Sequence, residues 1–158
     1  MSLSVADRWV EEPLRLFVDE ARVRLAVLME TSGQVLGQFG FARSVDLMTA
    51  CALSAAIHAT SNELGRMVDG KPFAVLHHAG VDRQIFLGEV PAAGGTLLLL
   101  VVFDDGSSLG VVQLFFREFC ARVTKAARPP APGAEVPALK EDFERELNRN
   151  LAVMFGRA

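Results

Sequence analysis

The sequence predicts an α/β protein of the α+β type, in which a five-stranded antiparallel sheet lies between helices on both faces and an extra C-terminal helix follows. Three observations predict this fold. Helical and strand patterns alternate in the order helix, two strands, helix, three strands, helix. The strands are joined by short connections, as antiparallel neighbours are. Residues 97–103, LLLLVVF, are all apolar, so this strand must be buried on both sides and lie at the centre of the sheet.

The first helix is expected over residues 5–21, with Ser4 as its cap. Pro13 lacks a backbone N–H and must kink or restart this helix. The next stretch, VRLAVLMETSGQVLGQFGF, predicts strands over 23–29 and 34–41 that are joined by a tight turn. The first two strands should therefore form a hairpin.

The second helix is expected to begin after Asp46, a good N-cap residue, because helix formers run without Pro or Gly from Leu47 until Gly65. The segments KPFAVLHHA, RQIFLGEV and TLLLLVVF then predict three strands with short connections, which form an antiparallel meander. Ser107 or Ser108 caps a third helix. Its apolar residues recur at helical spacing at Leu109, Val112, Phe116, Phe119 and Val123.

The length of 158 residues suits one domain with an appendage. We expect the domain over 1–127, a stiff Pro-rich linker over 128–138 (RPPAPGAEVPA) and an amphipathic helix over 139–158. The last helix has a narrow apolar stripe on an otherwise charged surface, which is typical of a segment that docks in a groove. The residues of this stripe are Leu139, Phe143, Leu147, Leu151 and Met154.

Composition excludes several classes of function. A net charge of −3 with 22% charged residues gives no basic field for nucleic acid. The longest apolar run, Thr96–Phe103, is too short to span a membrane, and the charged N-terminus does not resemble a signal peptide, so a cytoplasmic protein is expected. Cys51 and Cys120 lack metal-ligand spacing and are expected as reduced, buried thiols.

No motif predicts catalysis, a metal site or a cofactor. Gly65–Pro72, GRMVDGKP, matches a phosphate-binding loop except that Pro72 replaces the hydroxyl residue, and the order here is helix into strand. Gly65 and Gly70 are expected instead to end the second helix and turn the chain into the next strand. Adjacent His77 and His78 point to opposite faces of a strand and cannot share one metal ion. Ser54 and His58 are one helical turn apart, but no oxyanion loop accompanies them. The DDGSSLG stretch is expected to form a capped strand-to-helix corner rather than an anion site, because its two aspartates would repel an anion.

The informative anomaly is the second helix. Its apolar residues Ala50, Leu53, Ile57, Leu64 and Val68 are predicted to face the sheet, while Met48, Cys51, Ala52, Ala55, Ala59 and Asn62 fall on the outer side. An exposed helix normally carries charges on its outer side, yet no residue from Leu47 through Asn62 is charged. The small alanines would let another helix approach closely. We therefore expect a second copy or a partner to cover this side; the alternative is cover by the chain's own C-terminal helix.

The order of elements and three segments resemble the roadblock family of dynein-light-chain-like proteins, over about residues 23–123. The segments are LAVLMETSGQVLGQFG, the Ala-rich helix from Asp46 to Met67, and LLLLVVFDDGSSLGVVQL. The resemblance implies a roadblock/longin-like, profilin-like fold. It also implies a homodimer in which the second helices pack together and the third strands meet to extend the sheet.

The resemblance further implies that the dimer binds a small Ras-like GTPase and alters its hydrolysis or nucleotide state, in processes such as cell polarity or motility. Such regulators are noncatalytic, need no cofactor and insert no arginine finger. The implied dimer and GTPase interface falls on Met48, Cys51, Ala52, Ala55, Ala59, Asn62, Glu63 and Arg66.

Two alternatives stay open. A structural adaptor of the same fold would assemble complexes without regulating a GTPase. A sensor would hold a small ligand against the sheet, although the sequence lacks convergent polar residues for one.

Overall fold

The computed structural model describes residues 8–126 together with Arg145 and Arg149. The chain divides into two units, Met1–Ala127 and Arg128–Ala158. The predicted linker and apolar stripe of the C-terminal segment lie outside the described residues, so both stay predictions. The first unit contains, in order, α1 (Arg8–Ala21), β1 (Leu25–Glu30), β2 (Val35–Gly40), α2 (Leu47–Asp69), β3 (Val75–Ala79), β4 (Gln84–Ala92), β5 (Gly95–Phe103) and α3 (Leu109–Ala126).

The five strands form one antiparallel sheet in the order β2-β1-β5-β4-β3, which confirms the predicted fold class. The hairpin of β1 and β2 is joined to the meander of β3, β4 and β5 through the pairing of β1 with β5. As predicted, β5 is the central strand. Every residue from Leu98 to Phe103 is at most 5% exposed, because both sides of this strand lie under helices.

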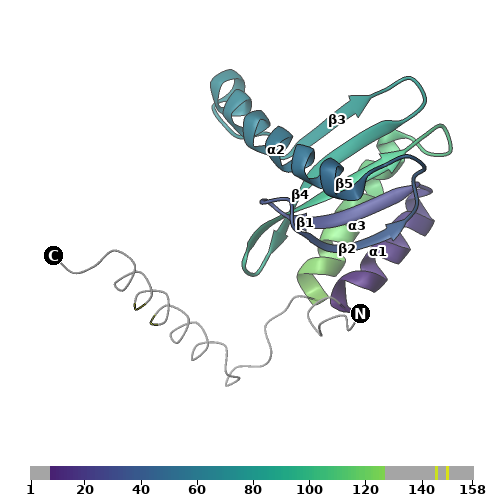
Figure 1. Ribbon diagram of the computed structural model, residues 1–158, viewed down its shortest axis with the longest axis horizontal. Coiled ribbons are helices and arrows are strands. Elements are labelled where there is room, and N and C mark those ends of the chain that lie inside the picture. Colours follow the sequence, from purple (N-terminus) through teal and green to yellow (C-terminus); the bar gives the residue numbers. More distant parts are fainter. Residues whose placement is uncertain (1–7, 127–144, 146–148, 150–158) are drawn as a thin grey trace. The chain divides into compact units, whose positions relative to one another are not determined.

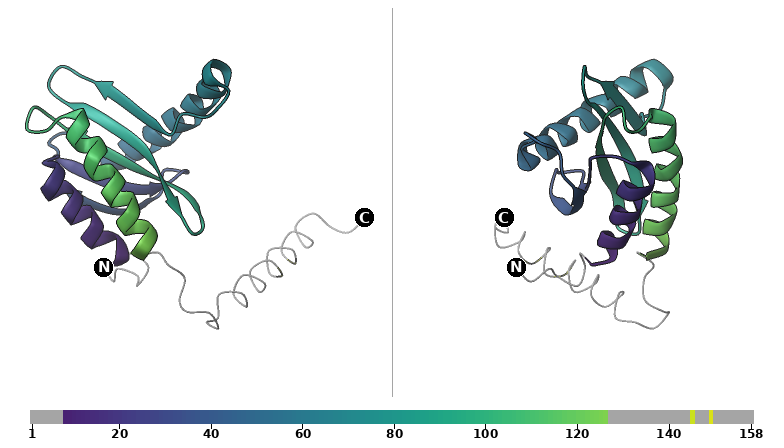
Figure 2. Two further views of the ribbon diagram at one scale, coloured as in Figure 1. Left: turned by 180° about the vertical axis from the view of Figure 1, so that it is seen from behind. Right: turned by 90° about the vertical axis from the view of Figure 1, so that its right-hand side faces the viewer.

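The sheet separates two layers of helix (Figures 1 and 2). Helices α1 and α3 cover one face and pack against alternate residues of β5, such as Leu99 and Val101. Helix α2 covers the other face, against Leu98, Leu100 and Val102. Helices α1 and α3 contact each other through the rings of Phe17 and Phe119, whose centroids are 5.7 Å apart in an edge-on contact. The predicted helix, sheet, helix sandwich is confirmed.

Helix α1 continues through Pro13 as a single helix, so of the two expected effects of this residue, a kink or a restart, the restart does not occur. Pro13 cannot donate a hydrogen bond to the preceding turn. The helix is held instead by its buried side, where Val10, Leu14 and Phe17 are at most 1% exposed. Packing against the sheet therefore outweighs the local cost of the proline.

The hairpin of β1 and β2 contains a bulge. Leu28 pairs with Gly37 and Met29 pairs with Val35, so Leu36 is an extra residue with no opposite partner. Gly37 is required beside it, because a Cβ atom there would lie 2.7 Å from the Cγ1 atom of Val10. Helix α1 consequently lies close on β2 at the glycine, and the bulge redirects the side chain of Leu36.

The DDGSSLG stretch forms the capped corner that the sequence predicts. Asp104 accepts a hydrogen bond from the backbone N–H of Gly106 at 3.0 Å and pairs with the guanidinium of Arg24 at 2.6 Å. These two contacts, the backbone bond first, hold the pKa of Asp104 below its usual value. Ser108 Oγ accepts from the N–H of Val111 at 3.3 Å in the first turn of α3. The carboxylate of Asp104 therefore already accepts from the backbone of Gly106 and from Arg24.

Replacement of Gly88 by alanine is expected to destabilise the fold. A Cβ atom at this position of β4 would lie 2.5 Å from the Cζ atom of Phe116, and overpacking of this kind costs about 1–3 kcal/mol. The matched control is Gly94→Ala, where the new atom meets nothing within 4 Å. Urea unfolding should show the difference, and equal midpoints for the two variants would contradict this account of the core.

Candidate protein-interaction site

Helix α2 contacts the sheet through a narrow stripe of small side chains. Cys51 is fully buried and Ser54 is 3% exposed, with Ala50 and Ile57 half-buried beside them. The hydroxyl of Ser54 donates to the carbonyl oxygen of Ala50 at 2.7 Å, which satisfies it within the helix. Small residues suit this position, because the sheet beneath already presents large ones such as Leu98 and Leu100.

A polar contact also joins α2 to the sheet. The Nε2 atom of His58 lies 2.7 Å from the Oε1 atom of Glu89 on β4, and the Nδ2 atom of Asn62 lies 3.3 Å from the same ring nitrogen. The Oδ1 atom of Asn62 is buried and has no partner within the described part of the chain. His58 and Asn62 therefore belong to the underside of the helix.

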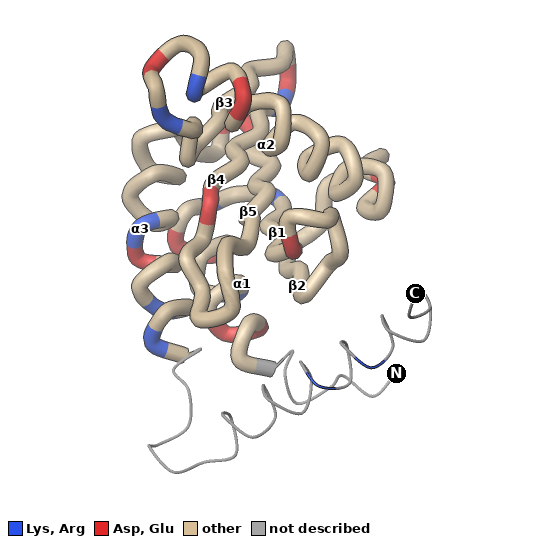
Figure 3. The backbone as a smooth tube through the Cα atoms, turned by 90° about the vertical axis from the view of Figure 1, so that its left-hand side faces the viewer, with Lys and Arg blue, Asp and Glu red and all other residues tan. Residues whose placement is uncertain are grey.

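The outer surface of α2 carries large apolar side chains. The exposed fractions are 81% for Met48, 58% for Leu53, 55% for Leu64, 84% for Met67 and 72% for Val68. The helix carries no charged residue before Glu63, as the tan colour of its first part in Figure 3 shows. Several large apolar side chains that are this exposed on one helix are typical of a protein-interaction site rather than of a surface that faces water.

The predicted side of the helix is partly wrong. Leu53, Leu64 and Val68 were expected to face the sheet, yet all three are exposed, whereas Ala50 and Ile57 do face it. The helix is rotated about its axis relative to the prediction, so that Cys51 and Ser54 are its most deeply buried side chains. The last turns of α2 also extend past the strands (Figure 2), and Val68 in these turns is 72% exposed.

Because of this rotation, the predicted interface residues do not all lie on the exposed side of the helix. Met48, Ala52, Ala59, Glu63 and Arg66 are exposed on the outer side, and Ala55 is half-buried at its margin. The predicted outer placement is wrong for Cys51, which is fully buried, and for Asn62, which lies beside His58 on the underside. Sequence reasoning missed Leu53, Leu64 and Met67. The sequence feature that could have identified them is the number of large apolar residues in this helix, which is greater than one face can bury.

The predicted burial of the two cysteines is confirmed for Cys51 and only partly for Cys120. Neither forms a disulfide, Cys51 is buried and Cys120 is half-buried. Burial raises the pKa of the Cys51 thiol and raises that of Cys120 to about 11. Both thiols are therefore protonated at neutral pH and poor nucleophiles.

An exposed strand edge lies beside the outer surface of α2. β3 pairs only with β4, so its other edge presents unpaired backbone groups, and Val75 on it is 41% exposed.

Gly65 allows the chain to return closely under the helix, since a Cβ atom there would lie 2.7 Å from the backbone nitrogen of Phe73. Gly70, with φ of 73°, ends the helix and donates its N–H to the carbonyl of Arg66 at 3.1 Å. This glycine segment is thus a helix end, as predicted, and Gly65 lies inside the helix.

The remaining motifs lack catalytic geometry. Ser54 donates to the backbone and His58 contacts Glu89, so the two do not form a dyad. The Nε2 atom of His77 lies at hydrogen-bond distance, 2.7 Å, from the Oε1 atom of Gln84, and the ring stacks on Phe103. The neighbouring His78 is exposed. Among the described residues no group of three or more His, Cys, Asp and Glu side chains could hold a metal ion. None of the described helices combines the length and apolarity that crossing a bilayer requires.

Comparison with known proteins identifies the fold. No family model matches the sequence, and no curated protein matches it. A structure of MglB with a tetrameric arrangement is similar at a TM-score of 0.70 and 23% identity, over 78% of this chain and 91% of that one. The gliding protein MglB from Thermus thermophilus is similar at 0.68 and 23%, over 78% and 92%. A Roadblock/LC7 domain from Streptomyces avermitilis is similar at 0.57 and 17%, over 74% and 92%. The described domain therefore has the fold of MglB and of the roadblock domain.

Proposed function

We propose that this chain is a roadblock-family homodimer that binds a small Ras-like GTPase in the cytoplasm and modulates its GTP hydrolysis or nucleotide state without catalytic residues of its own. The observation that carries the proposal is the outer surface of α2, whose exposed side chains include Met48, Leu53, Leu64 and Met67. Such a surface is more stable when another protein covers it.

The proposed dimer uses two features that lie side by side. The exposed leucines and methionines of α2 would pack against the same helix of a second copy, and small residues such as Ala52 and Ala59 would let the two backbones approach closely. The free edge of β3 would pair with its counterpart and extend the sheet. That one of the similar MglB structures is described as tetrameric supports an oligomer of this fold.

The GTPase partner is proposed from the roadblock resemblance together with the character of α2. The paired helices would present an uncharged platform whose border carries Glu63 and Arg66, an exposed ion pair within one turn. We assign no arginine a catalytic role. Phosphoryl transfer depends mainly on positioning and electrostatics, so a noncatalytic protein can change the rate by fixing the GTPase's own groups.

Substitution of Met67 by glutamate is expected to weaken the dimer by tenfold or more, roughly the effect of leaving a charge inside an apolar interface. Met67 is 84% exposed in the single chain, so the fold itself should tolerate the change. The matched control is Leu114→Glu, which places the same charge on an exposed position of α3 in the other helical layer. Sedimentation equilibrium measures both; equal dissociation constants for the two variants would rule out α2 as the interface.

Thiol labelling tests which side of α2 a partner covers. In the wild-type protein Cys51 should react with Ellman's reagent only on unfolding, because it is fully buried. An Ala52→Cys variant, with the new thiol on the exposed side, should react rapidly in dilute solution and at least about tenfold more slowly at concentrations where the dimer forms. Concentration-independent labelling at position 52 would contradict the proposed packing.

The GTPase proposal is tested by mixing the protein with purified small Ras-like GTPases loaded with GTP or GDP. Complex formation and phosphate release are measured together. We expect nucleotide-dependent binding and a changed hydrolysis rate, both reduced by Met48→Glu and unaffected by Leu114→Glu. A stable dimer that binds none of the GTPases and leaves hydrolysis unchanged would instead favour the structural adaptor.

A further inference from the structure

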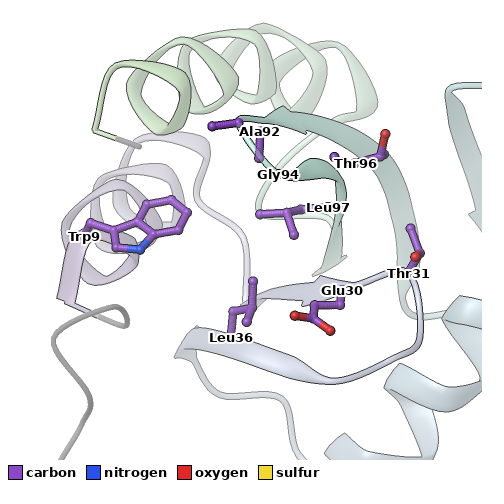
Figure 4. Close-up of a pocket in the computed structure, with 10 residues that line it drawn as sticks. Trp9, Glu30, Thr31, Leu36, Ala92, Gly94, Thr96 and Leu97 are labelled. Carbon is purple, nitrogen blue, oxygen red and sulfur yellow. The ribbon is translucent and has the colours of Figure 1, made fainter. Parts of the chain in front are cut away.

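A hollow of about 560 Å³ lies at one end of the sheet, between the first turns of α1, the turn that joins β1 to β2, and the hairpin that joins β4 to β5 (Figure 4). Trp9 forms one wall, and Leu36 and Leu97 form the apolar floor. Trp9 and Leu97 pack at the margin of the core under α1 and α3. The hollow therefore opens on the side of the sheet away from α2.

The β-bulge builds the floor of this hollow. Leu36 is the extra residue of β2, without an opposite partner on β1, and its side chain lies across from Leu97 in Figure 4. Bulges redirect side chains and are enriched beside binding sites. Next to it, Gly37 lets Val10 of α1 approach β2 closely, and Leu36 itself is half-buried.

The hollow presents both apolar surface and polar groups to a ligand. Trp9, Leu36 and Leu97 are only half-buried, so each presents apolar surface to the hollow. The indole N–H of Trp9 makes no hydrogen bond within residues 8–126. The exposed carboxylate of Glu30 has no ion pair in the same part of the chain, and it points toward the floor in Figure 4.

We propose that this hollow binds a segment of a partner protein that presents a bulky apolar side chain beside a lysine or arginine. The apolar side chain would lie on Leu36 and Leu97, and the cation would pair with Glu30. The indole N–H of Trp9 would donate to a backbone carbonyl of the segment. A peptide supplies all three groups at neighbouring positions. The floor of the site lies on the face of the sheet that α1 and α3 cover, opposite to the face that α2 covers.

Tryptophan fluorescence reports on this hollow directly, because Trp9 is the single tryptophan and the chain has no tyrosine. The probe is the peptide acetyl-Ala-Arg-Leu-Ala-amide, titrated into the full chain. A saturable blue shift is expected, with Kd on the order of 1 mM for so short a ligand. Replacing the peptide's leucine by serine should weaken binding roughly tenfold. Replacing its arginine by glutamate should weaken binding roughly tenfold, because an attraction to Glu30 becomes a repulsion.

Two variants locate the binding. Gly94→Leu places a side chain on the rim where a Cβ atom meets nothing within 4 Å, so it should block the hollow while the fold stays intact. Glu30→Gln should weaken binding of the arginine peptide about threefold, the value of a solvent-accessible ion pair. The matched control is Gly110→Leu at the start of α3, where a Cβ atom likewise meets nothing within 4 Å, and it should leave the titration unchanged.

Several outcomes overturn the proposal. No saturable shift with the arginine peptide would do so, as would equal shifts with all three peptides or an undiminished shift in Gly94→Leu. A shift of Trp9 emission that depends on protein concentration without any peptide would show that a second copy of the chain occupies the hollow instead. Far-ultraviolet circular dichroism of each variant separates loss of binding from loss of fold.

Discussion

The burial of β5 on both faces is the constraint on which the architecture depends. Its residues from Leu98 to Phe103 alternate between the layer of α1 and α3 and the layer of α2, so the strand can lie only in the middle of the sheet. The hairpin then pairs with one side of β5 and the meander with the other. This order leaves β2 and β3 at the two edges, and each edge is next to a candidate binding surface.

The two helical layers are packed very differently. Helices α1 and α3 bury large side chains such as Phe17, Phe116 and Phe119, which fill the space against the sheet. Helix α2 lies on small residues, with Cys51 and Ser54 at the contact, and a single polar bridge from His58 to Glu89 supplements them. The largest apolar side chains of α2 consequently remain on the outside, available to a partner.

The sequence was sufficient for the fold because periodicity reports burial directly. The all-apolar strand and the helix order predicted the sandwich, and Gly70 marked the end of α2. The rotation of α2 could not be predicted, because apolar residues such as Leu53 and Val68 look alike whether they face a sheet or a partner. Only the shape of the opposing surface decides which side is inside. The hollow beside Trp9 could not be predicted either. It depends on Leu36, the extra residue in the pairing of β1 with β2.

The close return of the chain at Gly65 has a mechanical consequence. Because the backbone of Phe73 packs against the helix at this glycine, the end of α2 is in close contact with the chain that leads into β3. A molecule that tilts the helix would displace the strand edge with it, and pairing along that edge would restrain the tilt in return. Any coupling between the helix surface and the strand edge would therefore need only these few adjacent residues and no change in the core.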